Sequence, residues 1–474
     1  MAWFRKKRGH NILQARGGGL AVLSECDFKS EVFQSKLWYR GIASELSQFY
    51  ALHDGHGQRG FWSQAAANGH IRKLHSGLPS IIIDTLCDIT MGDLLNIKLE
   101  NEADQALWDK IYADNNGARL FKKAVKQALC MGDGAFKISL DNNFANPIIE
   151  FYSAERLRYN YRRGRVSEVI FLSEISHDDN DYVLEEAYAH EGIFYRLLDH
   201  RGQAVSLKTL PQTAGLKDIG HNLGILLAIP LIFDDNPRHE GRGKSIYDGK
   251  SAIFDAIDEV LSQWIDALRD GRVQKYIPIG LIPRNPHNGR LMQHNTFASR
   301  YIQTEMDMSE GARNEIKVVQ PDIDIGAFQN TMLHYMEMAL AGIMAPETLG
   351  LDLKSRDNAR AQREREKATL YTRSKIIMAL RHSLTELIRA AICAHAAYFE
   401  NKLRPADEVK PCIEFGEYAA PSFDSQLEAV AKGVQGGVMS IDNAVEQLYG
   451  NSWSANQKQE EAAKIKEERG WTEK

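Results

Sequence analysis

Gly241–Arg272 reads GRGKSIYDGKSAIFDAIDEVLSQWIDALRDGR, and this stretch decides the fold. Its apolar residues recur at spacings of three and four, which predicts one long amphipathic helix. The capping box formed by Ser245 and Asp248 predicts that the helix begins at Ser245, and we expect it to end at Asp270. Over that span six acidic residues stand against two basic ones, so the polar face of the helix is predicted to be acidic.

The start of this stretch also resembles the end of a phosphate-binding loop, because Gly243, Lys244 and Ser245 follow one another there. Such a loop needs another glycine five residues before Gly243, so that the backbone can wrap a phosphate. That position holds Arg238. The sequence therefore favours a flexible entry into a helix over a nucleotide site.

Length and composition indicate a folded protein with several domains. The chain has 474 residues, 43% of them hydrophobic, and a net charge of −5. A nearly neutral chain is not expected to grip nucleic acid with its whole surface. The five cysteines are far apart, which predicts neither disulfides nor a zinc site. No apolar run is long enough for a membrane helix or a signal peptide, so we expect an intracellular protein that makes no contact with a membrane.

The first half of the chain changes period once. Residues 36–126 show helical spacing, including PSIIIDTLCDITMGDLL, and residues 135–210 show a period of two with polar turns between the runs. This order predicts a helical block followed by an antiparallel meander. The N-terminal residues 1–16 carry five basic residues and no acid, which favours a mobile basic arm over one that contacts nucleic acid or an acidic partner.

The second half is predicted to hold two more long helices and a small insertion. Residues 271–323 form the insertion, with a strand, a turn, a polar or helical piece and a second strand. Helical spacing returns at Ile325–Met344 and again from Ala359 to about Glu400. A strand and a helical tail from Phe423 follow.

Other motifs favour loops over chemistry. His53 and His56 have glycines around them, so solvated histidines are favoured over a metal pair. The cluster HDDND at 177–181 lacks the glycine and distal glutamate of a calcium loop, which favours a hairpin turn. Gly-Asp-Gly at 132–134 is typical of a helix stop and a tight turn. No catalytic residue, cofactor site or metal site is predicted.

Five segments in order resemble one known family. They are NGHIRKLHSGLPSIIIDTLCDITMGD (68–93), ALCMGDGAFKISLD (128–141), the opening stretch, MAPETLGLD with NARAQREREKATLYTRSKI, and GVMSIDNAVEQLYG. Their order and spacing over about 400 residues resemble phage portal proteins, the family typified by the portal of a Bacillus phage with a long non-contractile tail.

The resemblance implies an α+β portal fold that assembles as a ring of about twelve copies at one capsid vertex. It implies these parts: a basic N-terminal arm (1–34), a wing with a helical block and a β meander (35–244), a first stem helix (245–270), a clip (271–323), a second stem helix (324–346), a tunnel loop (347–358), a long helix with a return strand (359–422) and a helical crown (423–474).

The resemblance also implies partners and site residues. Double-stranded DNA would pass through the ring, and the other partners would be the terminase large subunit, a head-tail adaptor, and the major capsid and scaffolding proteins. Three sets of residues are expected to matter: Asp255, Asp258, Glu259 and Asp266 facing the channel, Lys354 and Arg356 touching DNA from the tunnel loop, and Arg284, His287 and Arg290 at the clip tip facing terminase or adaptor. The expected locations are the virion and, during assembly, the host cytoplasm.

Two other classes of function stay open at this point. A P-loop motor enzyme would turn over ATP, which the missing glycine argues against. A monomeric nucleic-acid-binding protein would bind DNA as a single copy with a steep salt dependence, which the net charge of −5 argues against.

Overall fold

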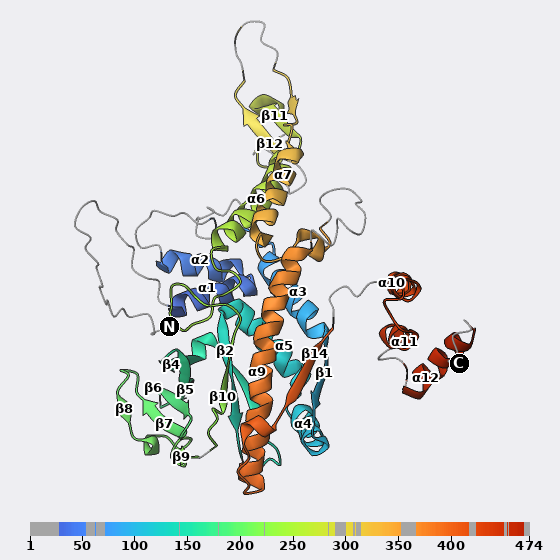
Figure 1. Cartoon of the computed structure of the whole chain (residues 1–474). Coiled ribbons are helices and arrows are strands. Elements are labelled where there is room, and N and C mark those ends of the chain that lie inside the picture. Colours follow the sequence, from blue (N-terminus) through green and yellow to red (C-terminus); the bar gives the residue numbers. More distant parts are fainter. Residues whose placement is uncertain are drawn as a thin grey trace, which may run out of the picture. The chain divides into compact units, whose positions relative to one another are not determined.

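The computed structural model (Figure 1) divides the chain into two compact units, residues 1–92 with 96–413, and residues 93–95 with 414–474. It describes residues 28–53, 62, 72–141, 143–178, 180–221, 223–282, 284–289, 300–306, 309, 314–351, 366–416, 423–449, 453 and 455–468. The basic N-terminal arm lies outside these residues up to Asp27. Helices and strands occur in both halves of the larger unit, so the predicted mixed α+β class is confirmed.

The predicted helical block is confirmed in the larger unit. Its helices are α1 (Phe28–Arg40), α2 (Ala43–His53), α3 (Leu78–Gly92), α4 (Glu102–Asp114) and α5 (Gly117–Met131). The apolar stripe of α3 buries Ile82, Ile83 and Leu86. The sequence prediction missed one strand here, because the helical spacing seemed to continue past Gly92. The helix ends at that glycine, and strand β1 (Leu94–Leu99) follows.

The predicted antiparallel meander is present but forms two sheets. The first has the order β10-β2-β3, from β10 (Ala228–Ile232), β2 (Asp133–Ser139) and β3 (Ile148–Ser153). The second has the order β4-β5-β6-β7-β8 with β9 beside β7; its strands are β4 (Leu157–Arg162), β5 (Arg165–His177), β6 (Asn180–Ala189), β7 (Gly192–Leu198), β8 (Ala204–Val205) and β9 (Ile219–Gly220). A short 3-10 helix, η1 (Ala154–Arg156), lies between β3 and β4 and separates the sheets.

The long helix predicted from Ala359 is described from Lys367 to Phe399 as α9. It packs on β10 and on α3 and α4, and it buries Leu380, Leu384 and Leu387 in the core of the larger unit. The predicted start of the helix lies outside the described residues. The return strand is β14 (Pro411–Phe415), which forms a two-stranded sheet with β1.

Two helices carry the insertion between them, as predicted. These are α6 (Ser251–Asp270) and α7 (Ile325–Leu340). Between them β11 (Gln274–Pro278), β12 (Arg300–Thr304) and β13 (Lys317–Val319) form a sheet in the order β12-β11-β13. The pair β11 and β12 is parallel, and β11 and β13 are antiparallel. Strand β12 corrects the prediction of a polar or helical piece at this position.

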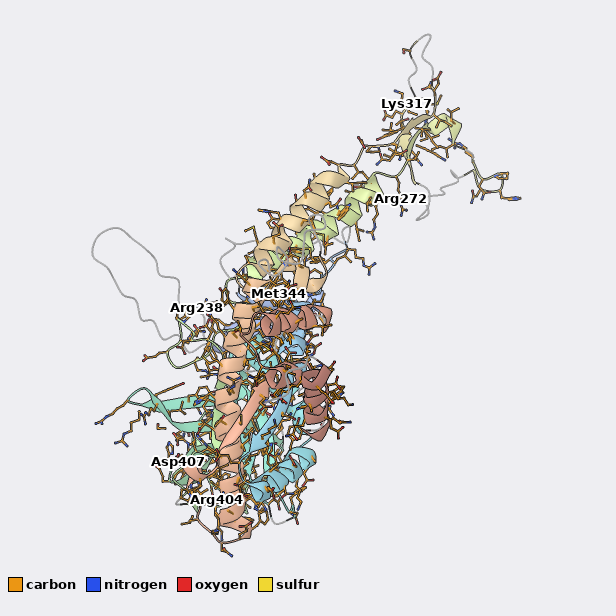
Figure 2. All side chains as sticks on the ribbon, turned by 45° about the vertical axis from the view of Figure 1, so that its right-hand side comes forward. Arg238, Arg272, Lys317, Met344, Arg404 and Asp407 are labelled. Carbon is orange, nitrogen blue, oxygen red and sulfur yellow. The ribbon has the colours of Figure 1, made fainter. Side chains whose placement is uncertain are left out.

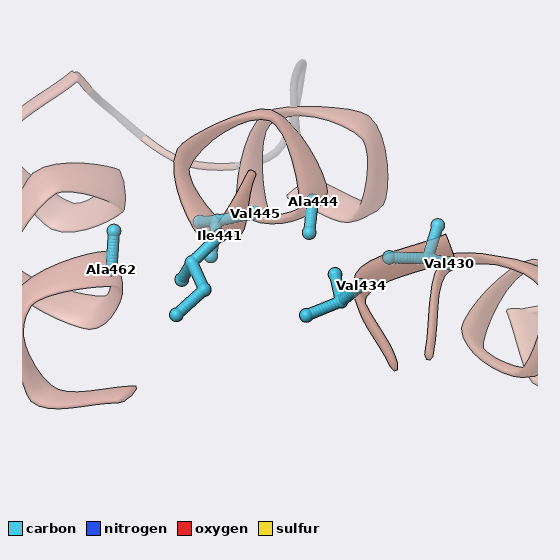
Figure 3. Packing of buried hydrophobic residues seen from close by; sticks show 6 residues of the cluster. All are labelled: Val430, Val434, Ile441, Ala444, Val445 and Ala462. Carbon is cyan, nitrogen blue, oxygen red and sulfur yellow. The ribbon is translucent and has the colours of Figure 1, made fainter. Parts of the chain in front are cut away.

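The smaller unit has a helical core of its own, as predicted for the tail. Its helices are α10 (Phe423–Gln435), α11 (Ile441–Tyr449) and α12 (Ala455–Glu468). Figure 3 shows how their small apolar side chains meet, and the buried set is Val430, Val434, Ile441, Ala444, Val445 and Ala462. The side chain of Lys466 on α12 also forms an ion pair with Asp442 on α11 at 2.7 Å.

Across the described ranges, none of the helices has both the length and the apolarity of a membrane span.

Candidate functional site at the α6–α7 helix pair

Helices α6 and α7 pack against each other along their apolar faces. Figure 2 shows the pair side by side between the levels of Met344 and Arg272. The rings of Trp264 and Phe328 stack between them, with centroids 6.1 Å apart and planes 4° apart. At the far end, the side chain of Asp324 caps α7 by accepting a hydrogen bond from the N–H of Ala327 at 2.9 Å.

The first helix begins later than the capping box predicts. Helix α6 starts at Ser251, and the residues before it form turns. Gly249 has a φ of +72°, a left-handed conformation that a right-handed helix does not contain. The Ser245 hydroxyl instead donates to the carbonyl oxygen of Cys130 at 2.5 Å. The capping box is therefore a false signal, and Ser245 anchors a turn to the end of α5.

Two of the four acidic residues predicted to face a channel are buried inside the chain's own fold. Asp255 accepts a hydrogen bond from the N–H of Trp62 at 2.6 Å. Asp258 accepts one from the N–H of Ser76 at 2.8 Å and lies 2.7 Å from Nδ1 of His75. Both side chains are almost fully covered. Within the single chain these two carboxylates are therefore not on the surface, where residues of a channel wall would have to lie.

Ser262 completes this row of acceptors on α6. One and two helical turns separate it from Asp258 and Asp255, so the three side chains lie on one face. Its hydroxyl oxygen accepts a hydrogen bond from the N–H of Leu74 at 3.0 Å. We call residues 72–77 the strap, because this segment has no regular secondary structure and lies along α6. Its backbone N–H groups have no partners in a sheet or helix, and they donate instead to side chains of α6.

The remaining surface of the helix pair carries very few cations. Glu259 and Asp266 are half-buried on α6, and Gln329, Asn330 and His334 are exposed on α7. Within α6 and α7 as described, Arg269 is the only lysine or arginine. The exposed face of the pair is thus neutral to acidic. The roles of Glu259 and Asp266 as channel-facing residues stay predictions.

A lysine joins the base of one helix to the end of the other. Nζ of Lys250, immediately before α6, donates to the carbonyl oxygens of Met338 and Ala341 at 2.9 Å each. These carbonyls belong to the last turn of α7 and to its C-cap residue, where the helix dipole favours a cation. Desolvation lowers the pKa of Lys250. Lys250 therefore acts as a C-cap supplied from the partner helix.

Replacing Lys250 by methionine is expected to destabilise the last turn of α7. The two carbonyls lose a charged donor, and we expect a loss of about 1–2 kcal/mol in the free energy of unfolding. Hydrogen exchange of the amides in the final turn of α7 should accelerate. Lys244→Met is the matched control, since Asp248, at 3.9 Å, is the one ion-pair partner of Lys244 among the residues that the structure describes. Equal exchange rates in the two variants would contradict the capping role.

The two glycine motifs noted in the sequence meet at the foot of α6. Asp133, in the 132–134 motif, is fully buried and accepts hydrogen bonds from Nε and Nη2 of Arg242 at 2.9 and 2.8 Å. The N–H of Gly243 also donates to Asp133, at 2.8 Å. The amide that a phosphate loop would offer to a phosphate is therefore already occupied by a carboxylate, which argues further against nucleotide binding.

The glycines on both sides are required for this contact. A Cβ on Gly243 would lie 2.1 Å from the carbonyl oxygen of Gly132, and a Cβ on Gly132 would lie 2.4 Å from that of Gly243. Gly132 also has a φ of +98°. Arg242 has further partners: it donates to the carbonyls of Leu157 and Ala154, and its guanidinium lies 4.0 Å from the ring centre of Phe28. Sequence reasoning treated the two motifs separately and missed this node.

A buried threonine fixes the chain just after α7. Oγ1 of Thr369 on α9 accepts a hydrogen bond from the N–H of Ala345 at 2.9 Å and lies 2.8 Å from Oγ1 of Thr348. Thr348 belongs to η4 (Pro346–Leu349), so Thr369 holds the beginning of the predicted tunnel loop against α9. Lys354 and Arg356, the predicted DNA contacts of that loop, lie outside the described residues.

The predicted clip tip is described only in part. Arg284 and His287 are exposed, and the N–H of His287 donates to the side chain of Asn285 at 2.9 Å, as in a tight turn. Arg290 lies outside the described residues. The sheet of the insertion and the residues next to its strands expose several large apolar side chains: Val273, Ile302, Ile316, Val318 and Val319, with Val318 61% exposed.

The HDDND cluster and the histidine pair noted in the sequence show no sign of a metal site where the structure describes them. The HDDND cluster forms the turn between β5 and β6, although Asp179 lies outside the described residues. Ser176 donates to Asp181 across that turn at 2.7 Å. His53 ends α2, and His56 lies outside the description. Among the described residues no group of three or more histidine, cysteine or acidic side chains is arranged to bind a metal ion.

An antiparallel helix pair that carries a small sheet at its far end, beside a long core helix, is the arrangement that the resemblance to portal proteins predicts. The family model for "Phage portal protein, SPP1 Gp6-like" matches residues 28–473. The chain belongs to this family of phage portal proteins. It is a family of structural proteins, not of enzymes.

Other comparisons add little to this assignment. No curated protein matches the sequence. Among solved structures, a chain in the virion of a native gene transfer agent particle has a TM-score of 0.39 at 12% identity, with 88% of this chain and 98% of that chain covered. A chain from the neck of the native particle, computed with C12 symmetry, has the same TM-score and identity, with 85% and 98% covered. TM-scores this low carry no argument, so the assignment rests on the family match.

Proposed function

We propose that this chain is the subunit of a portal ring of about twelve copies at one vertex of a virion, and that double-stranded DNA enters and leaves through the ring. The observation that carries the proposal is the exposed face of the α6–α7 pair, which has Arg269 as its only lysine or arginine. Membership of the portal family supplies the context.

A wall with few cations suits a channel through which DNA must move. Each lysine or arginine that neutralises a phosphate releases counterions and strengthens binding, and a ring multiplies each contact by its number of subunits. Such contacts would hold the duplex in place. A neutral or acidic wall, with Glu259 and Asp266 among its side chains, does not bind the phosphates and therefore lets the duplex slide.

Ring assembly is supported by the apolar surface of the clip sheet. Ile316, Val318 and Val319 are exposed in the single chain, and side chains of this kind usually become covered by a partner. We propose that neighbouring copies cover them. The clip tip, with Arg284, His287 and Arg290, would face the terminase large subunit and later the head-tail adaptor, while the major capsid and scaffolding proteins would surround the ring.

Lys354 and Arg356 remain the proposed contacts of the tunnel loop with the DNA backbone, read by charge and not by sequence. The role of the chain is structural in this proposal, and its sites of action are the virion and the host cytoplasm in which particles assemble.

Electron microscopy of the purified protein tests the assembly directly. We expect rings of about twelve subunits with a central hole. Monodisperse monomers that bind DNA as single copies would instead support a nucleic-acid-binding protein, and ATP turnover by the purified chain would support a motor enzyme.

Adding cations to the helix pair tests the channel wall. In rings that carry Gln329→Lys with Asn330→Lys, both on the exposed surface of α7, we expect normal assembly but a large fall in packaged DNA per particle. The added lysines should bind phosphates in every subunit, so raising the salt concentration should relieve the defect. Gln329→Glu with Asn330→Asp changes the same positions without adding cations and should package normally. Equal DNA content in particles of both variants would show that this surface of α7 does not face the DNA channel.

A further inference from the structure

A cleft of about 500 Å3 opens in the larger unit between α9 and strands β5 and β10. Its floor is apolar and includes Ile225, Leu226 and Ile229, while Ala379 and Ser383 of α9 form one wall. Ser383 is fixed by a hydrogen bond from its hydroxyl to the carbonyl oxygen of Pro230 at 2.7 Å. The cleft is thus a preformed feature of the packing between helix and sheet.

Cations surround the cleft. Arg165 at the start of β5 and Arg389 on α9 both line it, and Arg162, the last residue of β4, and Arg163 lie beside Arg165 at the turn between β4 and β5. Arg389 is held in place by Glu386 at 2.9 Å and by the carbonyl oxygen of Val409 at 3.0 Å. The three arginines of the turn are exposed and form no ion pair with any residue that the structure describes. An acidic partner would find unneutralised charge at this rim.

The same chain exposes a suitable acidic surface on α4. Glu102, Asp109 and Asp114 are exposed there, with Lys110 as the one basic residue of the helix. Exposed alanines at 103, 106 and 113 lie among them and allow another surface to approach closely. On this side Asp109 accepts a hydrogen bond from Gln105 at 2.9 Å and Asp114 accepts one from Asn146 at 2.6 Å. Both carboxylates remain exposed and keep further acceptor positions toward solvent, while the opposite side of α4 carries the packing.

The inner side of α4 fixes its position firmly. Trp108 and Ile111 are buried, and Asp104 accepts hydrogen bonds from Nη1 and Nη2 of Arg404 at 2.5 and 2.7 Å. The acidic side is therefore presented on a rigid element, as a specific contact requires.

The cleft and the acidic side of α4 cannot meet within one chain. Figure 1 shows α4 on one side of α9 and strands β5 and β10 on the other. Complementary surfaces on opposite sides of a subunit form a head-to-tail contact between copies, and such a contact closes into a ring when the rotation per subunit allows it.

We propose that the cleft between α9, β5 and β10 receives the acidic side of helix α4 from a second copy of this chain. The arginines of the rim pair with Asp109 and Asp114 of the incoming helix, and its alanines lie over the apolar floor. The inference rests on the proposed ring and assigns one of the contacts that join neighbouring subunits.

Charge reversal on each surface tests the contact. The cleft variant carries Arg163→Glu with Arg165→Glu, and the helix variant carries Asp109→Lys with Asp114→Lys. Each variant alone places like charges opposite one another, so the concentration needed for ring assembly should rise about tenfold or more. Lysines near the end of α4 also suit its dipole, so the helix should stay folded.

A mixture of the two variants gives the decisive result. In a ring that alternates them, every contact again joins opposite charges, and assembly should return to the wild-type concentration. Arg201→Glu with Lys208→Glu changes two exposed cations away from the cleft and should assemble like the wild type. Sedimentation velocity and electron microscopy would measure the ring population, and circular dichroism would check that each variant is folded.

The outcomes separate this contact from the proposed function. Wild-type rings together with normal assembly of either single-surface variant would overturn the contact and leave the portal ring standing. Failure of the mixture to assemble would also overturn it. A wild-type chain that forms no rings would instead count against the proposed function itself.

Discussion

Replacing Asp133 by alanine is expected to lower the free energy of unfolding by about 3–5 kcal/mol, the usual effect of breaking a buried ion pair. The change leaves the guanidinium of Arg242 without a carboxylate and the N–H of Gly243 without its acceptor at 2.8 Å. Asp133 is fully buried, and the Arg242 side chain is only 14% exposed, so water cannot take the place of the lost oxygens.

Chemical denaturation of the variant would measure this loss. Glu155→Ala is the matched control, because the pair of Glu155 with Lys36, also at 2.8 Å, is partly open to solvent and should contribute less than about 1 kcal/mol. Asp133→Leu combined with Arg242→Met should recover part of the stability, since it removes both charges at similar volume but leaves the N–H of Gly243 without its acceptor. A loss under 1 kcal/mol for Asp133→Ala would show that the node does not hold the foot of α6.

Asp258→Ala should release the strap from α6 and lower the free energy of unfolding by about 2–4 kcal/mol. Asp258 is buried. Its Oδ1 accepts a hydrogen bond from the N–H of Ser76 at 2.8 Å, and its Oδ2 lies 2.7 Å from Nδ1 of His75. A hydrogen bond to a charged group contributes more than one between neutral groups, and the orphaned N–H adds a desolvation penalty.

Hydrogen exchange gives the local signature of this change. The amides of Leu74 and Ser76 should exchange much faster in the Asp258→Ala variant. Ser262→Ala removes the bond from the N–H of Leu74 and the bond that the hydroxyl donates to the carbonyl oxygen of Asp258, but it leaves the Asp258 carboxylate in place, so it should cost about 1 kcal/mol. Glu259→Ala, next along the helix and half-buried, should leave the strap protected. Slow exchange at Ser76 without the Asp258 carboxylate would mean that other contacts hold the strap.

The main elements of the fold were predictable because their signals are local. The spacing of apolar residues along α6 and α7 reflects one face that must pack, and the insertion between them follows from a change of period. Boundaries were less predictable. The capping box at Ser245 is a four-residue pattern, whereas the actual start at Ser251 depends on the left-handed conformation of Gly249, which that pattern ignores.

The candidate site was harder to predict, because its contacts join distant parts of the chain. An amphipathic helix suggests that its acidic residues face solvent, yet Asp255 and Asp258 are buried against amides some 180 to 190 residues earlier in the sequence. Asp133 and Gly243 are 110 residues apart, so neither glycine motif reveals the other. Strand β12 was missed because its partner β11 lies parallel to it across a long connection.

The insertion between α6 and α7 leaves and re-enters the helix pair at almost one point. Gly271, just after α6, lies against Ile323, just before α7, because a Cβ on Gly271 would lie 2.0 Å from Cδ1 of Ile323. Two antiparallel helices with ends this close are ordinarily joined by a loop of about 2–5 residues. A shortened chain in which such a loop replaces residues 272–322 should still form the stacked pair of Trp264 and Phe328. We therefore expect that the insertion can be exchanged for another small module without redesign of the two helices that carry it.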